Sequence, residues 1–121
     1  YNRHPSLGAF GTDMTCEIAR EIGTNITYGW LITQVVSGGP ADEAGLRGGT
    51  RQVLIAGEWV TVGGDVIIAI NETRITNIDD LSTYLEEYTL PGQTINVTIV
   101  RSNLIMTITV ELGARSPPSV S

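Results

Sequence analysis

The sequence has too little cysteine and histidine for the chemistry that these residues usually carry. Cys16 is the single cysteine of the 121 residues, and His4 is the single histidine. One cysteine cannot form an internal disulfide, and the two residues fall short of the three or four ligands of a zinc site. We therefore expect no metal centre and no cofactor. His4 lies beside Pro5 near the start of the chain, where we expect a linker histidine rather than a catalytic base.

Lysine is absent, and positive charge is scarce. Seven arginines face thirteen acidic residues, so the net charge is −6 and the pI is about 4.5. Such a surface repels phosphate groups, which disfavours nucleic acid and anionic membrane surfaces as partners. No apolar run reaches the ~18 residues of a membrane-spanning helix, and no leader pattern opens the chain. Because the chain starts at Tyr1, we expect a fragment of a longer protein, which leaves room for a catalytic partner domain outside this sequence.

Three Asn-x-Ser/Thr triplets are present, beginning at Asn25, Asn71 and Asn96. About one is expected by chance from this composition. Threonine-rich strands produce such triplets without any glycan, and an extracytoplasmic protein that carries glycans would have them too. Both interpretations stay open.

Short β-branched stretches alternate with short helical ones. Several short strands, two or three short helices and no βαβ spacing predict a small α+β fold around a curled antiparallel sheet. The stretch at about 50–64 reads as an inserted β-hairpin, because two apolar pieces flank Gly57 between glycine pairs. We expect strands at residues 29–36, 65–70, 94–100 and 104–112, a short extended piece at 7–10 closed by Gly11, and helices at 16–22, 40–45 and 78–88, the last capped by Asn77.

Ser37 lies in a Ser-Gly-Gly-Pro motif that resembles the nucleophile loop of trypsin-like proteases. The motif lacks the preceding Gly-Asp, and the only histidine is 33 residues upstream. A turn from a strand into a helix that starts at Pro40 explains every residue of the motif. We therefore expect no reaction with a serine-directed fluorophosphonate. The adjacent carboxylates at 79–80 and 86–87 read as a solvated helix face.

A loop and a helix form the remaining constellation. The glycine-containing loop at residues 7–10 can turn consecutive N–H groups toward one point, which suits a peptide carboxylate. The exposed edge of the strand after it can accept an extended peptide. The stripe of Leu81 and Leu85 can form the floor of a pocket, although the same leucines would serve equally as ordinary core.

Four stretches resemble the PDZ domains attached to HtrA (Deg) trypsin-like serine proteases: SLGAFGTDMTCEIAREIG, YGWLITQVVSGGPADEAGLRGGT, VGGDVIIAINETRITNIDDLSTYL and INVTIVRSNLIMTITVELG. The resemblance covers nearly the whole chain. It implies a partly open antiparallel β-barrel or sandwich of five to six strands flanked by short helices, with a hairpin insert at about 50–64. It also implies a peptide-binding module that captures C-terminal or exposed hydrophobic segments and positions or regulates a separate protease domain. It implies no catalysis by this chain.

The resemblance also implies the site residues. Ser6 stands where the family usually has Tyr or Trp, and Ala9 where it usually has Ile or Val, so the pocket is expected to be wide and to prefer a large apolar terminal residue. The carboxylate-binding loop corresponds to Ser6, Leu7, Gly8 and Ala9, the peptide-pairing strand to Phe10, Gly11 and Thr12, and the pocket to Leu81, Ser82, Tyr84 and Leu85.

These patterns divide the chain into a linker at 1–6, a PDZ domain at 7–113 and a Pro/Ser-rich tail at 114–121. The expected partners are C-terminal or unfolded protein segments, a covalently linked protease domain and further copies in a homo-oligomer of the parent, in an extracytoplasmic location. Two alternatives stay open. One is a structural module for interdomain contact or oligomerisation, and the other is a PDZ domain of another membrane-associated protease or secretion component.

Overall fold

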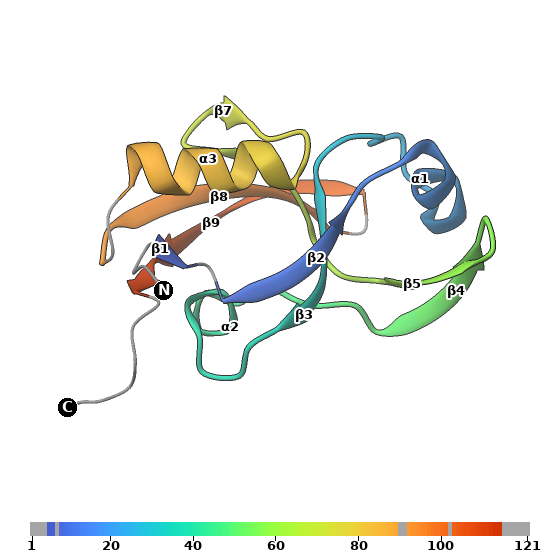
Figure 1. Cartoon of the computed structure of the whole chain (residues 1–121), viewed down its shortest axis with the longest axis horizontal. Helices are drawn as coiled ribbons and strands as arrows, with labels where there is room; N and C mark the ends of the chain where they lie inside the picture. The colour runs from blue at the N-terminus through green and yellow to red at the C-terminus, as the bar shows by residue number, and fades with distance from the viewer. Residues whose placement is uncertain (1–4, 7, 90–91, 102, 115–121) are drawn as a thin grey trace.

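The computed structural model describes residues 5–6, 8–89, 92–101 and 103–114. Its main sheet is antiparallel with strand order β2-β3-β6-β8-β9, and β7 pairs with β6 (Figure 1). This architecture confirms the predicted α+β class. The strands are β1 Pro5–Ser6, β2 Ala9–Asp13, β3 Trp30–Val35, β4 Arg51–Ile55, β5 Glu58–Val62, β6 Val66–Ile70, β7 Thr73–Arg74, β8 Thr94–Arg101, β9 Leu104–Glu111 and β10 Gly113–Ala114, and the helices are α1 Cys16–Ile22, α2 Pro40–Ala44 and α3 Ile78–Tyr88.

Helix α1 has the caps that its sequence predicts. The Thr15 hydroxyl accepts a hydrogen bond from the Ile18 N–H at 3.1 Å, which satisfies one free donor of the first turn. Gly23 ends the helix in the left-handed conformation with φ 78°. The predicted helix at 16–22 is therefore confirmed.

Helix α3 begins differently from the predicted capping box. The Asn77 side chain accepts from the Asp80 N–H at 2.9 Å, as that motif requires. The Asp80 carboxylate, however, accepts from the N–H and hydroxyl of Thr76 instead of bonding back to Asn77. The cap therefore extends one residue further upstream and ties the β7–α3 loop to the first helical turn.

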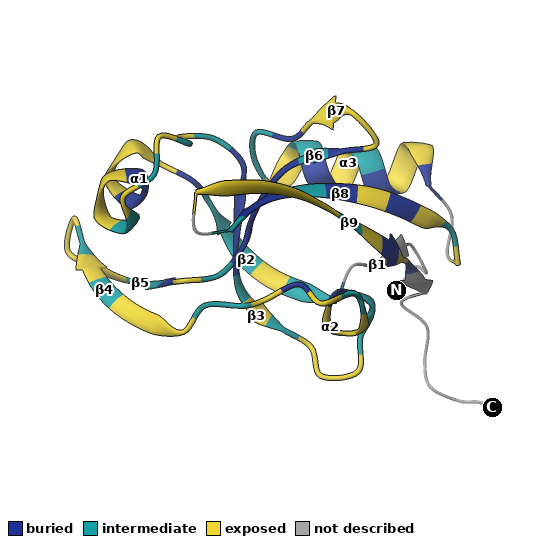
Figure 2. Ribbon diagram, turned by 180° about the vertical axis from the view of Figure 1, so that it is seen from behind, coloured by how far each residue is buried: buried dark blue, intermediate teal, exposed yellow. Residues whose placement is uncertain are grey.

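The sheet has an apolar core on each side, because successive side chains of a strand point to opposite faces. The first core, which we call the α3 core, lies between the sheet and α3. The second, the α1 core, lies between the sheet, α1 and the β4–β5 hairpin. Figure 2 shows the buried positions concentrated on the central strands and the exposed ones on the hairpin and along β9. Ile32, Ile67 and Ile99 belong to the α3 core, and their neighbours Leu31, Val66 and Val100 belong to the α1 core.

The ends of the described chain meet in a small sheet of their own. Strand β1 pairs antiparallel with β10, with Pro5 opposite Ala114 and Ser6 opposite Gly113. This pairing corrects the expected boundaries, since residues 5–6 were assigned to a linker and Ala114 to a tail. The hairpin was predicted correctly, because β4 and β5 form a separate two-stranded sheet with Ile55 opposite Glu58.

A partly buried ion pair joins three elements at the root of the hairpin. Asp65 is 1% exposed and accepts from Arg101 Nε at 2.8 Å, from Arg101 Nη2 at 2.7 Å and from the Arg47 N–H at 3.0 Å. Arg101 Nη2 also donates to the Gly45 carbonyl at 2.9 Å. The hydrogen bond with Asp65 raises the pKa of Arg101 above its usual value. The pair thereby connects the end of α2, the start of β6 and the end of β8.

No helix in the described part of the chain is long and apolar enough to cross a membrane. Across the same residues, no group of three or more His, Cys, Asp or Glu side chains is placed to hold a metal ion.

Candidate peptide-binding site

Strand β2 lies at the edge of the main sheet, with β3 as its single strand neighbour among the described residues. At one end the Gly8 carbonyl accepts from the Val36 N–H, and at the other the Met14 N–H donates to the Gly29 carbonyl, both at 2.9 Å. Since backbone groups alternate in direction along an antiparallel strand, those of Ala9, Gly11 and Asp13 point away from β3. This side of β2 can accept another strand.

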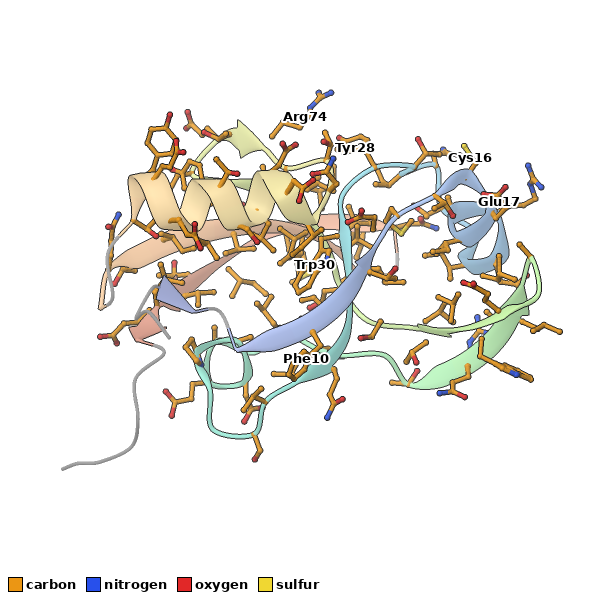
Figure 3. All side chains as sticks on the ribbon, viewed as in Figure 1. Phe10, Cys16, Glu17, Tyr28, Trp30 and Arg74 are labelled. Carbon is orange, nitrogen blue, oxygen red and sulfur yellow. The ribbon has the colours of Figure 1, made fainter. Side chains whose placement is uncertain are left out.

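Within the predicted pairing strand, only alternate residues face the free edge. Gly11 offers its backbone to the free edge, whereas the backbone groups of Phe10 and Thr12 face β3. The Phe10 side chain is 57% exposed, and Figure 3 shows its ring on the side of β2 away from α3. Ala9 and Asp13, on either side of the predicted trio, replace Phe10 and Thr12 as the residues that can pair.

Gly11 does not end the first strand, as the sequence suggested, but lies inside β2. A Cβ at this position would fall within 2.9 Å of two atoms of the Trp30 indole and also against the Leu31 carbonyl oxygen. Trp30 is 5% exposed, belongs to the α3 core and lies between β2 and α3 (Figure 3). The indole therefore forms the floor beneath β2, and only glycine lets the strand pass over it. Trp30 was not among the residues selected from the sequence.

The loop before β2 packs against the Gly-Gly-Pro turn. Gly8 has φ 76°, and a Cβ there would lie 2.9 Å from Pro40 Cδ and 3.5 Å from Gly39 Cα. The Gly8 N–H takes part in none of the hydrogen bonds of the described residues. The predicted role of this N–H as a donor to a ligand stays a prediction, and no described partner occupies it. Leu7 lies outside the described residues, and Ser6 is part of β1.

The Ser-Gly-Gly-Pro motif at Ser37 forms a turn from a strand into a helix, as the non-catalytic interpretation predicts. Ser37 is exposed, the Gly39 N–H donates to the Val36 carbonyl at 3.0 Å, and the Gly38 N–H donates to Asp42 Oδ2 at 2.9 Å. Pro40 then begins α2. Because the two glycines have no side chains, the loop around Gly8 can pack directly against the turn. This packing explains the motif without a catalytic role.

The far end of β2 is attached to the start of α3. Asp13 Oδ1 accepts a hydrogen bond from the Ile78 N–H at 2.7 Å. Ile78 is the first residue of α3, so its N–H has no partner within the helix. This bond fixes the separation of β2 and α3 at one end, and neither residue was predicted to belong to the site.

Helix α3 presents the predicted pocket residues in different directions. Leu81 is 3% exposed and Leu85 is 7% exposed, and both pack in the α3 core with Trp30. Ser82 is exposed and lies near Ile78 on the helical wheel, on the side that Asp13 ties to β2. The Tyr84 hydroxyl accepts from Asn71 Nδ2 at 3.3 Å, so this ring belongs to the flank beside the β6–β7 turn. We replace Tyr84 with Ile78 in the candidate pocket.

An antiparallel sheet with a free edge strand beside a helix, preceded by a glycine loop, is the arrangement of PDZ domains. The profile of the PDZ-domain family matches residues 11–112, and the chain belongs to this family.

Among PDZ proteins, the chain is similar to HtrA-type proteases, as the sequence motifs indicated. It is 31% identical over 107 residues to the "Probable periplasmic serine endoprotease DegP-like" of Hahella chejuensis (strain KCTC 2396), covering 88% of this chain. The chain spans 19% of that protein's length.

Two solved structures have the same fold. A variant of the HtrA-type protease AlgW, solved with a decapeptide, is 26% identical with a TM-score of 0.74, and the match covers all of this chain and 32% of AlgW. The HtrA3 PDZ domain, bound to a phage-derived ligand, has a TM-score of 0.66 over 93% of this chain and 88% of its own. At 13% identity, it supports the fold alone.

Proposed function

We propose that this chain is the peptide-binding module of a larger HtrA-type serine protease. It captures a free C terminus or an exposed apolar segment by adding it as a strand to β2, and it positions or regulates a protease domain elsewhere in the parent. The observation that carries the proposal is the outward direction of the backbone groups of Ala9, Gly11 and Asp13 along an edge strand beside α3. The AlgW structure that matches this chain was itself solved with a decapeptide.

In this proposal the terminal carboxylate lies at the loop, where the Gly8 and Ala9 N–H groups donate to it. The last side chain then enters the space between Ala9 and Leu85. Because Ala9 is small, this pocket takes a large apolar residue such as Phe, Leu or Val. Further from the terminus, the peptide passes Ile78 and Ser82 and leaves the groove beside Asp13.

The decisive experiment compares peptides that have a free C terminus with the same peptides amidated. Saturable binding of apolar-ended peptides that amidation abolishes supports the proposal, and equal binding of a peptide ending in Asp contradicts the pocket preference. Two variants test the placement: Gly8→Pro removes one donor and cannot keep the positive φ of Gly8, and Leu85→Arg places a charge in the pocket. Leu104→Arg controls for the added charge alone, since Leu104 is 65% exposed on β9 and Leu85 is 7% exposed. The placement fails if Gly8→Pro or Leu85→Arg binds like the control.

A structural role is the second candidate, and burial within the groove favours it. Trp30, Leu81 and Leu85 are at most 7% exposed without any ligand, so the molecule's own side chains fill much of the floor. In this role the domain mediates interdomain contact or oligomerisation. Peptide binding that is absent or indifferent to the terminus, together with oligomers of the parent that this domain is needed to form, would move support to this role.

The proposed location is extracytoplasmic, in agreement with the periplasmic relative. The three Asn-x-Thr triplets add little to it. Asn71 Oδ1 accepts from the Asn96 N–H at 2.8 Å, and Asn96 Oδ1 accepts from the Thr109 hydroxyl at 3.2 Å. Two of the three asparagine side chains thus hold β-strands together, which favours the explanation of these triplets as strand sequence. Asn25 is exposed in the α1–β3 loop.

A further inference from the structure

A second cleft lies on the α1 core, on the opposite face of the sheet from the groove. It consists of two adjoining cavities of about 170 and 360 Å³, which share Thr24, Val100 and Asn103. One cavity reaches the root of the β4–β5 hairpin at Arg51, and the other reaches Ile105 at the start of β9. Figures 1 and 2 both place α1 beside the hairpin, at the end of the molecule where β2 runs into α1.

Arg51 is the only charged side chain among the described residues that line this cleft. It is exposed, it has no ion pair or hydrogen bond with a described residue, and it shares the inner face of β4 with Val53 and Ile55. In a chain of net charge −6, a lone guanidinium inside a cleft attracts an anion and not a cation.

Two backbone donors belong to residues that line the same cavity as this guanidinium. Gly63 and Gly64 line the same cavity, and the N–H groups of these two consecutive residues take part in none of the hydrogen bonds of the described chain. Gly63 has φ 99°, and a Cβ on Gly64 would meet the Ile32 carbonyl oxygen and the backbone at residues 48–49. Consecutive free N–H groups next to an arginine are suited to a planar carboxylate.

The cleft also has an apolar part, beside the polar side chains of Thr24, Asn25 and Asn103. Ile105 lies at the far end of the cleft and is 68% exposed. Antiparallel sheets usually bury the apolar side chains of one face, so an isoleucine this exposed is unusual. Asn103 Nδ2 donates to the Gly23 carbonyl at 3.1 Å, which holds the β8–β9 turn against the end of α1. The side chains that line the apolar part are Ile22, Ile26, Val66, Val100 and Ile105.

We infer that this cleft is a second peptide-docking site, which takes a carboxylate carried next to a large apolar side chain. The carboxylate binds Arg51 and the N–H groups of Gly63 and Gly64, and the apolar side chain extends toward Ile26 and Ile105. The carboxylate comes from a chain terminus or from an Asp or Glu side chain, because both present the same two oxygens. The site does not depend on the groove between β2 and α3.

The test maps backbone amide chemical shifts of the isotope-labelled 121-residue chain during titration with three probes. N-acetyl-leucine carries a terminal carboxylate, acetyl-Leu-Glu-amide carries a side-chain carboxylate, and N-acetyl-leucinamide carries none. We expect saturable shifts at Gly63, Gly64 and Asn103 with at least one of the first two probes and none with the third. The probe that binds more tightly identifies the source of the carboxylate.

Two variants and a control complete the design. Arg51→Gln is expected to weaken binding at the cleft about tenfold or more, because it removes a charge-assisted pair. Arg20→Gln removes the same charge from exposed Arg20 in α1, which does not line the cleft, and is expected to bind as the unaltered chain does. Leu85→Arg blocks the groove and is expected to leave the cleft shifts in place.

Several results would overturn the inference. They are shifts confined to Gly8 and Gly11, equal shifts with N-acetyl-leucinamide, equal weakening by Arg51→Gln and Arg20→Gln, and no saturable shift at the cleft up to the solubility of the probes. Cleft shifts that persist in Leu85→Arg while groove binding is lost separate this inference from the proposed function.

Discussion

Asp13 and Ile78 lie 65 residues apart in sequence, yet Asp13 Oδ1 accepts the first free N–H of helix α3 from Ile78 at 2.7 Å. Asp13 ends the edge strand β2, and Ile78 begins the helix on the other side of the candidate groove. A carboxylate at a helix N-terminus also faces the positive end of the helix dipole. The bond therefore determines how far apart the two walls of the groove stand at this end.

Asp13→Ala is expected to destabilise the domain by about 1 kcal/mol, the usual contribution of a single cap or hydrogen bond. Peptide affinity should fall by about threefold to tenfold, because a wall that is no longer held must be ordered on binding. Asp13→Asn keeps an acceptor oxygen and should retain most of both. Urea unfolding and peptide titration measure the two effects. An affinity loss as large in Asp13→Asn as in Asp13→Ala would show that the charge of Asp13, and not its hydrogen bond to the helix, supports peptide binding.

The secondary structure was largely readable from the sequence because its signals are local. Thr15, Gly23, Pro40 and Asn77 each act within four residues of their own position, so the helix boundaries followed from cap and turn chemistry. Gly11 was misjudged for the opposite reason. Glycine usually ends a strand, and what keeps it inside β2 is the Trp30 indole, which becomes its neighbour only after β2 and β3 have paired.

The same limit applies to the candidate site. The glycine loop and the leucines of α3 follow recognisable patterns, so the sequence alone was enough to select them as candidates. Asp13 and Ile78 come together only through the packing of α3 across the sheet, and no local signal marks them. Tyr84 shares the helix with Leu81 and Leu85, but its hydroxyl accepts from Asn71, a partner that the helix sequence does not reveal.

Gly11→Ala is expected to destabilise the domain by about 2–3 kcal/mol, the cost of forcing an atom into a packed interior. The new Cβ would meet a backbone carbonyl oxygen as well as the Trp30 ring, so a side-chain rotation cannot relieve the contact. Thr12→Ala, at the next position of β2, serves as the control and should change stability by much less. Chemical unfolding followed by Trp fluorescence measures both. A Gly11→Ala variant as stable as Thr12→Ala would mean that β2 can move away from Trp30.

Asp65→Asn is expected to cost about 3 kcal/mol, because it leaves a partly buried guanidinium without its counter-charge. Asp65 accepts three hydrogen bonds in a nearly fully buried position, and the uncharged amide cannot accept all of them. Glu58→Gln removes the same charge from an exposed site on the hairpin and provides the control. The urea midpoint should fall with little change in the slope of the transition. Equal midpoints for Asp65→Asn and Glu58→Gln would contradict the role assigned to the pair.

The hydrogen bonds from Thr76 to the Asp80 carboxylate are expected to make the unfolding free energy depend on pH in the acid range. The Thr76 hydroxyl, and after it the Thr76 N–H, lower the pKa of the Asp80 carboxyl below its usual value of 3.8. A carboxyl whose pKa is depressed by folding stabilises the native state fully above the unfolded-state value, and this stabilisation disappears as the pH falls through the folded-state value. The difference in unfolding free energy between the unaltered chain and Asp80→Asn should therefore be constant above about pH 5 and shrink below pH 3.8.

Thr76→Val keeps the N–H but removes the hydroxyl, so it should raise the pKa of Asp80 toward 3.8, which carboxyl chemical shifts measure directly. An Asp80 that titrates at the same pH with and without the Thr76 hydroxyl would exclude this origin of the shift.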